Sequence, residues 1–348
     1  MDEILQKYSV LKGYRQPEPF GNGHINDTYL VTSQNSKFIL QRVNNRVFDT
    51  PVLVKNLDFL FEALGDYEQN TGEKLTPRAI KNDNGEFHTL DNKGAAWRLM
   101  EFIPQCHSYA ISPNEAVSYR AAKTIGRFQL FLNTLPVRTF GETIKNFHNP
   151  SDRLKVFLGT LASAPDRLKK QAAAEIRFVE KNQNIALQFG HIPQLPLRVT
   201  HNDTKLDNIL FTDDDRAFVI DLDTIMPGYI LYDYGDMVRT FTSPAKEDEP
   251  DTSESFLRPE HFEALTKGYL EPLKKVLANQ EKASLLFGAK AIIYEQILRF
   301  LTDFLLGNIY YKTAYPEHNL VRTRTQIRLL DDILNQESRL LKIIEKII

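Results

Sequence analysis

The segment from His201 to Asn208 carries the densest set of side chains suited to catalysis. It contains Asp203 two positions after the histidine, and Asn208 follows five positions later. Phosphoryl-transfer loops have this spacing, with the aspartate accepting the proton of the attacking hydroxyl and the asparagine binding a metal ion. A solvated turn is the alternative, because Asp and Asn are common turn residues. The spacing predicts Asp203 as a catalytic base and Asn208 as a metal ligand.

Two further aspartates end an apolar run shortly downstream. The run Val219-Ile220 leads into Asp221-Leu222-Asp223. Magnesium prefers oxygen ligands and takes one or two carboxylates from a protein, while phosphates and waters complete its shell. A simple turn after a strand would not explain why a buried apolar run ends in acids. We therefore predict Asp221 as the principal metal ligand, and Asp223 as a second ligand or a support for the loop.

A turn with two glycines near the N-terminus is the third feature. Gly23 lies in the segment 21–27, between two expected strands, where glycine lets backbone amides approach a phosphate. In the next strand Leu40 and Arg42 share a face, because side chains alternate along a strand. In a kinase-like lobe that face would present Leu40 to adenine and Arg42 to the phosphates. The alternative for Arg42 is an exposed strand cation.

The elements that must position these residues change in character near residue 103. Alternating β-branched and aromatic residues predict strands at 28–31, 37–43, 78–81 and 96–103, with a helix at 51–69. Beyond them, helical periodicity is expected at 113–133, 151–160, 166–188, 258–278, 283–306 and 325–346. We expect an α+β, bilobal fold. A nucleotide-binding lobe of about five strands and one helix would span 1–103, and a helical catalytic and substrate-binding lobe 104–348.

Composition excludes several classes of function. The 43 Lys and Arg residues nearly balance 45 Asp and Glu residues, and the net charge of −2 provides no broad field for nucleic acid or an acidic membrane. The single cysteine, Cys106, cannot form an internal disulfide. No run approaches the ~18 apolar residues that span a bilayer, and the N-terminus lacks the apolar core of a signal peptide. We expect a soluble, cytoplasmic protein.

In this order, the motifs resemble the aminoglycoside phosphotransferase and choline kinase superfamily, whose fold is similar to that of protein kinases. The resemblance implies ATP and Mg²⁺ as cofactors, with Asp203 as the base and Asn208 and Asp221 on the metal. His201 would brace the catalytic loop, and Asp236 would anchor that loop from a helix.

The resemblance also implies a nucleotide-binding hinge at Met100-Glu101-Phe102-Ile103. The carbonyl of Glu101 and the amide of Ile103 would read adenine. Arg42 stands where the superfamily usually has lysine, and either cation binds phosphate, with different geometry. Two acids on the helix, Asp58 and Glu62, are candidates for the acidic partner of Arg42.

Within the superfamily, the segments 23–28, 38–43 and 298–303 are similar to the N-acetylhexosamine 1-kinase group. This implies transfer of phosphate to the anomeric hydroxyl of an N-acetylhexosamine, with His24, Arg299 and Tyr310 contacting the sugar beside Asp203. Alternatives are a kinase for an aminoglycoside, an amino alcohol or another sugar, or a non-catalytic nucleotide-binding module. The retained base and metal ligands argue against the last. The preferred epimer and the choice between monomer and dimer stay open.

Overall fold

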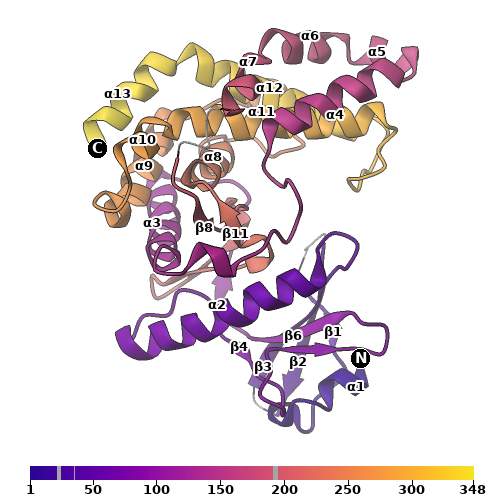
Figure 1. The fold of residues 1–348 in the computed structure, drawn as a ribbon, viewed down its shortest axis with the longest axis vertical. Coiled ribbons are helices and arrows are strands. Elements are labelled where there is room, and N and C mark those ends of the chain that lie inside the picture. Colours follow the sequence, from indigo (N-terminus) through magenta and orange to yellow (C-terminus); the bar gives the residue numbers. More distant parts are fainter. Residues whose placement is uncertain (22–24, 35, 191–194) are drawn as a thin grey trace. The chain divides into compact units, whose positions relative to one another are not determined.

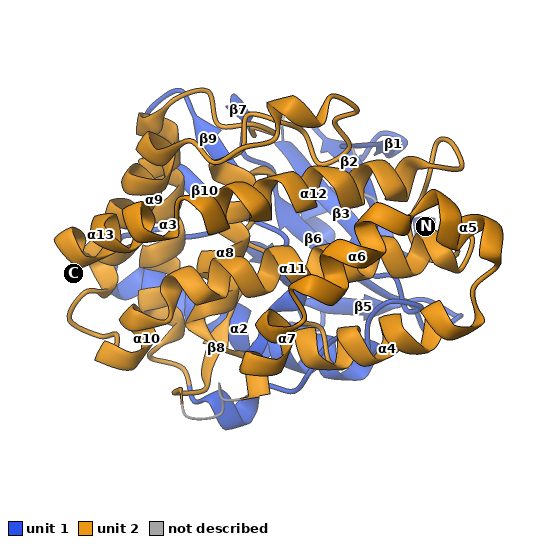
Figure 2. Ribbon diagram, turned by 90° about the horizontal axis from the view of Figure 1, so that it is seen from above, with its two compact units in different colours: residues 1–107, 136–145, 210–227 blue, residues 108–135, 146–209, 228–348 orange. Residues whose placement is uncertain are grey.

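The computed structural model describes residues 1–21, 25–34, 36–190 and 195–348. These residues form two compact units, each made of three chain segments (Figure 2). Unit 1 comprises Met1–His107, Pro136–Lys145 and Leu210–Pro227, and unit 2 comprises Ser108–Leu135, Asn146–Ile209 and Gly228–Ile348. The chain therefore passes between the units several times. The division into an N-terminal lobe of residues 1–103 and a C-terminal lobe of residues 104–348 stays a prediction.

Unit 1 is built on an antiparallel sheet, as expected for the N-terminal region. The strand order is β1-β2-β3-β6-β4, with β5 also paired to β6. The strands are β1 (Glu18–Pro19), β2 (Asp27–Ser33), β3 (Ser36–Arg42), β4 (Ala79–Ile80), β5 (His88–Leu90) and β6 (Ala96–Glu101). A second sheet has the order β10-β9-β7, from β7 (Cys106–His107), β9 (Ile209–Thr212) and β10 (Ala217–Val219), and β11 (Met226–Gly228) follows.

Helix α2 (Thr50–Thr71) fulfils the expectation of a helix at 51–69. The side chain of Asp49 caps its N-terminus by accepting the backbone N–H of Val52, and Pro51 occupies the first turn, where its missing N–H has no partner to lose. Gly72 ends the helix in the left-handed conformation, with φ of 72°. The local sequence thus defines both ends of α2.

Different elements cover the two faces of the sheet of unit 1 (Figure 1). The N-terminal helix α1 (Asp2–Leu5) and the 3₁₀ turn Ser9–Leu11 contribute to an apolar cluster on one face. The cluster consists of Ile4, Leu5, Tyr8, Leu11, Val31, Phe38, Leu40, Trp97 and Leu99. Helix α2 packs on the other face, where Asp58 accepts a 2.7 Å hydrogen bond from His88 of β5. Because His88 pairs with Arg98, Arg98 also lies on the α2 face.

Unit 2 is mainly helical, as predicted for the C-terminal region. Its helices are α3 (Glu115–Leu132), α4 (Pro150–Ser163), α5 (Asp166–Gln171), α6 (Ala173–Lys181), α7 (Asn184–Gln188), α8 (Ile230–Phe241), α9 (Pro259–Leu273), α10 (Asn279–Ala283), α11 (Leu285–Leu305), α12 (His318–Asn335) and α13 (Glu337–Ile347). The expected helix at 166–188 is divided into three, and the one at 325–346 breaks at Gln336. A short strand, β8 (Arg198–Thr200), precedes the Asp203 segment.

Helices α8 and α11 approach closely at paired glycines. A Cβ added at Gly235 would lie 2.5 Å from the carbonyl oxygen of Gly288, and one at Gly288 would lie 2.6 Å from that of Leu231. Only glycine allows this separation between the two backbones. In the described parts of the chain no helix is both long and apolar enough to cross a membrane.

Candidate active site

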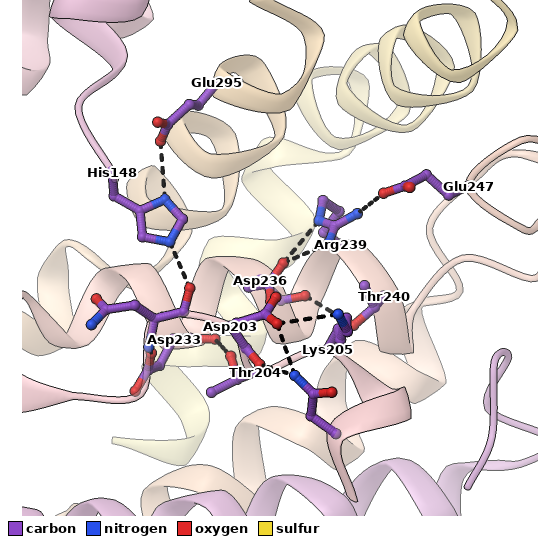
Figure 3. A network of polar contacts seen from close by, with 12 residues as sticks. His148, Asp203, Thr204, Lys205, Asp233, Asp236, Arg239, Thr240, Glu247 and Glu295 are labelled. Atoms are coloured by element: carbon purple, nitrogen blue, oxygen red, sulfur yellow. Dashed lines mark hydrogen bonds and ion pairs between the residues drawn. The ribbon is translucent and has the colours of Figure 1, made fainter. Parts of the chain in front are cut away.

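The loop after β8 brings Asp203 and Asn208 together within unit 2. The side-chain nitrogen of Asn208, at the end of the 3₁₀ turn Leu206–Asn208, donates to the Asp203 carbonyl at 2.8 Å and to its Oδ2 at 2.9 Å. Lys205 Nζ lies 3.1 Å from the same Oδ2 (Figure 3). Because Asn208 turns its nitrogen toward Asp203, its side-chain oxygen is left as a ligand for a hard cation.

The surroundings of Asp203 keep its carboxylate ionised. Burial by itself would raise the pKa of Asp203, but the charges of Lys205 and His201 and the hydrogen bonds from Lys205 and Asn208 lower that pKa to about 2. The side chain is still 24% exposed, so a hydroxyl group can reach it. The sequence interpretation assigned no role to Lys205, although its place two residues after the aspartate was visible.

Helix α8 holds the backbone of this loop through Asp233. The carboxylate of Asp233 accepts the backbone N–H groups of His201 at 3.1 Å and Asn202 at 2.6 Å, and its carbonyl accepts the Thr204 hydroxyl at 2.7 Å. The resemblance assigned this contact to Asp236, and the structure corrects the assignment to Asp233. Asp233 lies in the first turn of α8, whereas Asp236 lies nearly one turn further along.

Asp236 instead pairs with Arg239 at 2.8 Å, and Arg239 reaches Glu247 at 2.7 Å (Figure 3). Arg239 is buried, and the charges of Asp236, Glu247 and Asp203 outweigh the effect of burial and raise its pKa. Asp236 therefore supports the site through a buried cation. His201 contacts the loop itself, since its Nδ1 accepts the backbone N–H of Asp203 at 3.3 Å.

His148 supports the loop from a distant part of the sequence. Its Nε2 donates to the carbonyl of Asn202 at 2.7 Å, across 54 sequence positions, and its Nδ1 lies 3.2 Å from Glu295 of α11 (Figure 3). Burial alone would lower the pKa of His148, but the charge and hydrogen bond of Glu295 and the Asn202 carbonyl raise it. Sequence reasoning gave this histidine no functional role, because no local pattern links it to the loop.

One helical turn beyond Glu295, Arg299 lies among aromatic rings. Its guanidinium is 5.4 Å from the ring centre of Phe147 and 5.7 Å from that of Tyr311. Burial alone would lower the pKa of Arg299, but the charges of Tyr311 and Glu295 and a hydrogen bond with Tyr310 raise it. Tyr310, the other predicted substrate contact in this region, is 63% exposed.

Asp303 fixes the segment that follows α11. Its carboxylate accepts the backbone N–H groups of Ile309, Tyr310 and Tyr311 at 2.8–3.0 Å. The Tyr311 hydroxyl is buried without a hydrogen-bond partner among the described residues. Asp303 is therefore occupied by these backbone groups and by the side chain of Asn319, whereas the Tyr311 hydroxyl is left for a ligand.

In unit 1, the two aspartates after β10 differ in their environments. Asp221 has a left-handed backbone, with φ of 61°, directly before the 3₁₀ turn Leu222–Thr224. Asp223 is 1% exposed and bonds to the Arg98 guanidinium and to Asn26. A non-glycine residue in the left-handed region is strained, and such residues concentrate at functional sites.

The adenine contact predicted for Leu40 is corrected by the structure. Leu40 is fully buried in the apolar cluster against α1, so it has no surface to offer to adenine. Arg42 shares that face, 3.3 Å from Asp27 and 5.9 Å from the Trp97 ring centre. The alternation of side chains was correct, but α1 covers the face at Leu40; the contact of Arg42 with phosphate stays a prediction.

Neither acid proposed as the partner of Arg42 fills that role. Asp58 bonds His88 at 2.7 Å, and Glu62 pairs with Lys81 at 2.6 Å. Arg98, next to Asp223, is a buried cation on the α2 face.

The predicted hinge residues end β6. Met100 pairs with Ile39 across the sheet, and the backbone N–H of Glu101 donates to the backbone carbonyl of Arg78 at 2.8 Å. The Glu101 carboxylate pairs with Lys74 at 2.8 Å, while Ile103 is buried. Gly23 and His24 lie outside the described residues, so their assignments stay predictions.

The family model described as "Phosphotransferase enzyme family" matches residues 17–269. Since this match covers well over half of the 348 residues, the chain belongs to that family, whose members are small-molecule phosphotransferases. Two solved structures share the fold. A microcompartment-associated aminopropanol kinase is 15% identical with a TM-score of 0.61, covering 96% of each chain. An aminoglycoside phosphotransferase from Alicyclobacillus acidocaldarius is 14% identical with a TM-score of 0.61, covering 99% of this chain and 96% of that one.

A choline kinase from Cryptosporidium parvum is 13% identical, with a TM-score of 0.57, and the match covers 97% of this chain and 96% of that one. At such identities the likeness shows the fold and leaves the acceptor to the residues of the site itself.

Proposed function

We propose that this chain transfers the γ-phosphate of ATP to the anomeric hydroxyl of an N-acetylhexosamine. The observation that supports a sugar acceptor is Arg299, a cation set beside the rings of Phe147 and Tyr311. A site for choline or an aminoglycoside needs aromatic faces or carboxylates free for a cation. Here Arg299 already occupies the aromatic faces and repels a second positive charge.

Asp203 would orient and deprotonate the acceptor hydroxyl. With a pKa of about 2 it is a carboxylate at neutral pH, and Asn208 holds both its side chain and its carbonyl. Lys205, 3.1 Å from Asp203, is a cation near the point where charge would develop on the transferred phosphoryl group. Positioning and charge stabilisation are the main demands of phosphoryl transfer.

Asn208 and Asp221 would hold Mg²⁺, which neutralises charge on the phosphates of ATP. Both offer the oxygen atoms that this cation prefers. The turn containing Gly23 would approach the phosphates, and the backbone of Glu101 and Ile103, after Met100, would bind adenine. His24 and Tyr310 would complete the sugar contacts. With one cysteine, Cys106, free, we also propose a reducing, cytoplasmic setting.

The test is a coupled assay of ATP consumption with N-acetylglucosamine, N-acetylgalactosamine, galactose, choline, aminopropanol and an aminoglycoside. We expect turnover with an N-acetylhexosamine and formation of an alkali-stable, acid-labile sugar 1-phosphate. Turnover restricted to the cationic acceptors would reject the sugar assignment.

Arg299→Gln and Arg324→Gln form a matched pair for the acceptor site. Arg299→Gln should raise KM for the sugar about tenfold or more, because a charge-assisted hydrogen bond contributes about 1.5–3 kcal/mol. Arg324 lies on α12, pairs with Glu175 at 2.6 Å and is 44% exposed, so its replacement should leave KM unchanged. Equal effects of the two replacements would remove Arg299 from the acceptor site.

A further inference from the structure

An ion pair is buried in unit 1 between β6 and the loop that follows β10. Arg98 Nη1 contacts Asp223 Oδ1, and the two side chains are 3% and 1% exposed. A buried ion pair repays its desolvation only when its remaining hydrogen-bonding groups find partners. Arg98 Nε donates to Gln41 at 3.0 Å, and Asp223 Oδ2 accepts from Asn26 Nδ2 at 2.5 Å. The pair is thus embedded in a polar network on the α2 face of the sheet.

These contacts use both carboxylate oxygens of Asp223. Its backbone carbonyl also accepts the Thr143 hydroxyl, at 2.8 Å. A metal ion bound by Asp223 would have to displace Arg98 or Asn26 from a site that is almost fully buried. Ligation by Asp223 is therefore unfavourable, and the second role that the sequence left open for it, support of the loop, gains a structural basis.

The network joins three segments that carry proposed ligand contacts. Asn26 precedes β2 and also accepts the backbone N–H of Asn44 at 3.0 Å. Arg98 lies on β6, two residues before Met100. Asp223 follows Asp221 by two residues, and Asp221 has the strained left-handed backbone. A strained conformation persists only when its surroundings determine it, and the anchored Asp223 supplies that constraint on one side.

We propose that Arg98 and Asp223 are a positioning pair that holds Asp221 in place for the metal ion. Arg98 then acts on the nucleotide site through Asp223, from the face of the sheet opposite Arg42. This inference rests on the proposed metal site at Asp221.

The experiment compares Asp223→Asn, Arg98→Gln, their double variant and Arg98→Lys, with Arg216→Gln as the control. Arg216 pairs with Asp214 at 2.9 Å in the same unit, but these side chains are 62% and 57% exposed. Calorimetric ADP binding with and without Mg²⁺ gives the metal-dependent part of the affinity. Turnover is expressed per ADP-binding site, which corrects for any unfolded fraction.

We expect Asp223→Asn and Arg98→Gln each to lower kcat about tenfold or more and to weaken the metal-dependent part of ADP binding equally. KM for the acceptor should stay within about twofold. Because the two residues act as one unit, the double variant should be no worse than the worse single variant. Arg98→Lys should keep more activity than Arg98→Gln, and Arg216→Gln should match the wild type.

Two results would overturn the proposal. The first is a loss of the metal-dependent part of ADP binding in Asp223→Asn while Arg98→Gln stays near the wild type, which would make Asp223 a metal ligand. The second is losses that multiply in the double variant, or no loss at all. If the single variants do not fold, Asn26→Ala removes the hydrogen bond to Asp223, together with the one from the Asn44 N–H, and leaves the ion pair. Asn26→Ala should then lower kcat and the metal-dependent part of ADP binding, each by less than the single variants were expected to. Wild-type values of both quantities would count against the proposal.

Failure of the acceptor assignment is separable from failure of this inference. If the wild type binds MgADP but phosphorylates no N-acetylhexosamine, the acceptor assignment is wrong. The metal-dependent part of ADP binding still decides the role of the pair.

Discussion

Asp203 combines accessibility with a low pKa, and its neighbours achieve both. Lys205 and Asn208 bind the carboxylate from the side of the loop, while Asp233 and His148 hold the adjacent backbone at His201 and Asn202. The charge of the base and its position are thus controlled by different residues. A substitution at the base should therefore affect turnover much more than nucleotide binding.

Asp203→Asn tests this separation. The amide cannot take up the hydroxyl proton, so kcat should fall by about 10² to 10⁴. ADP affinity should stay within about threefold. The matched control is Asp213→Asn, an exposed aspartate in the turn after β9, which should keep wild-type kcat. A similar loss in both variants would point to a general loss of folded protein.

The pH dependence of kcat/KM gives a second test at this scale. With a pKa of about 2, Asp203 is ionised throughout the range from about pH 5 to 8, and it should produce no acidic limb there. Because this pKa lies below the ordinary value, ionised Asp203 stabilises the fold above about pH 4, and this stabilisation is lost as pH falls toward 2. An inflection in kcat/KM near pH 6 that disappears in Asp203→Asn would contradict the assignment.

At the scale of elements, α8 links packing to catalysis. It presents Asp233 to the loop and Gly235 to α11, so the helix cannot shift against α11 without moving the anchor of the loop.

Gly235→Ala should therefore reduce both stability and turnover. The added Cβ would lie 2.5 Å from the Gly288 carbonyl, and overpacking of this kind lowers the free energy of unfolding by about 1–3 kcal/mol. Gly159→Ala in α4 is the control, because no atom lies within 4 Å of its added Cβ. It should raise the free energy of unfolding by about 0.5–1 kcal/mol. Urea denaturation followed by circular dichroism measures the free energy of unfolding of both variants, and the coupled assay measures their turnover.

What the sequence could predict depended on distance along the chain. The pairing of Asp203 with Asn208 follows from their spacing, and the ends of α2 follow from Asp49 and Gly72. The contact of Arg98 with Asp223 spans 125 positions, and no local pattern encodes it. The error at Leu40 has the same origin. Alternation identified the residues that share its face, but only tertiary packing decides that α1 covers that face.

At the scale of the whole molecule, ligand binding should raise the free energy of unfolding. A ligand that binds only the folded state at 100 times its Kd raises the free energy of unfolding by about 2.7 kcal/mol. MgADP should therefore raise the melting temperature, and EDTA should remove most of that shift. In Asp221→Asn the dependence on Mg²⁺ should disappear, whereas Asp213→Asn, in an exposed turn, should behave like the wild type. An unchanged Mg²⁺ dependence in Asp221→Asn would exclude Asp221 as a ligand.

The discontinuous make-up of unit 1 leads to a prediction about fragments. The side chain of Asn56 in α2 donates to the backbone carbonyls of Gly141 and Ile225, and the backbone N–H of Val219 donates to the carbonyl of Leu75. Segments later in the sequence therefore complete the unit. A fragment of residues 1–107 would lose these partners and leave Arg98 as a buried cation without its carboxylate. We expect it to lack a cooperative thermal transition, while the full chain melts cooperatively. A fragment with native-like melting would instead support an independent N-terminal domain ending near residue 103.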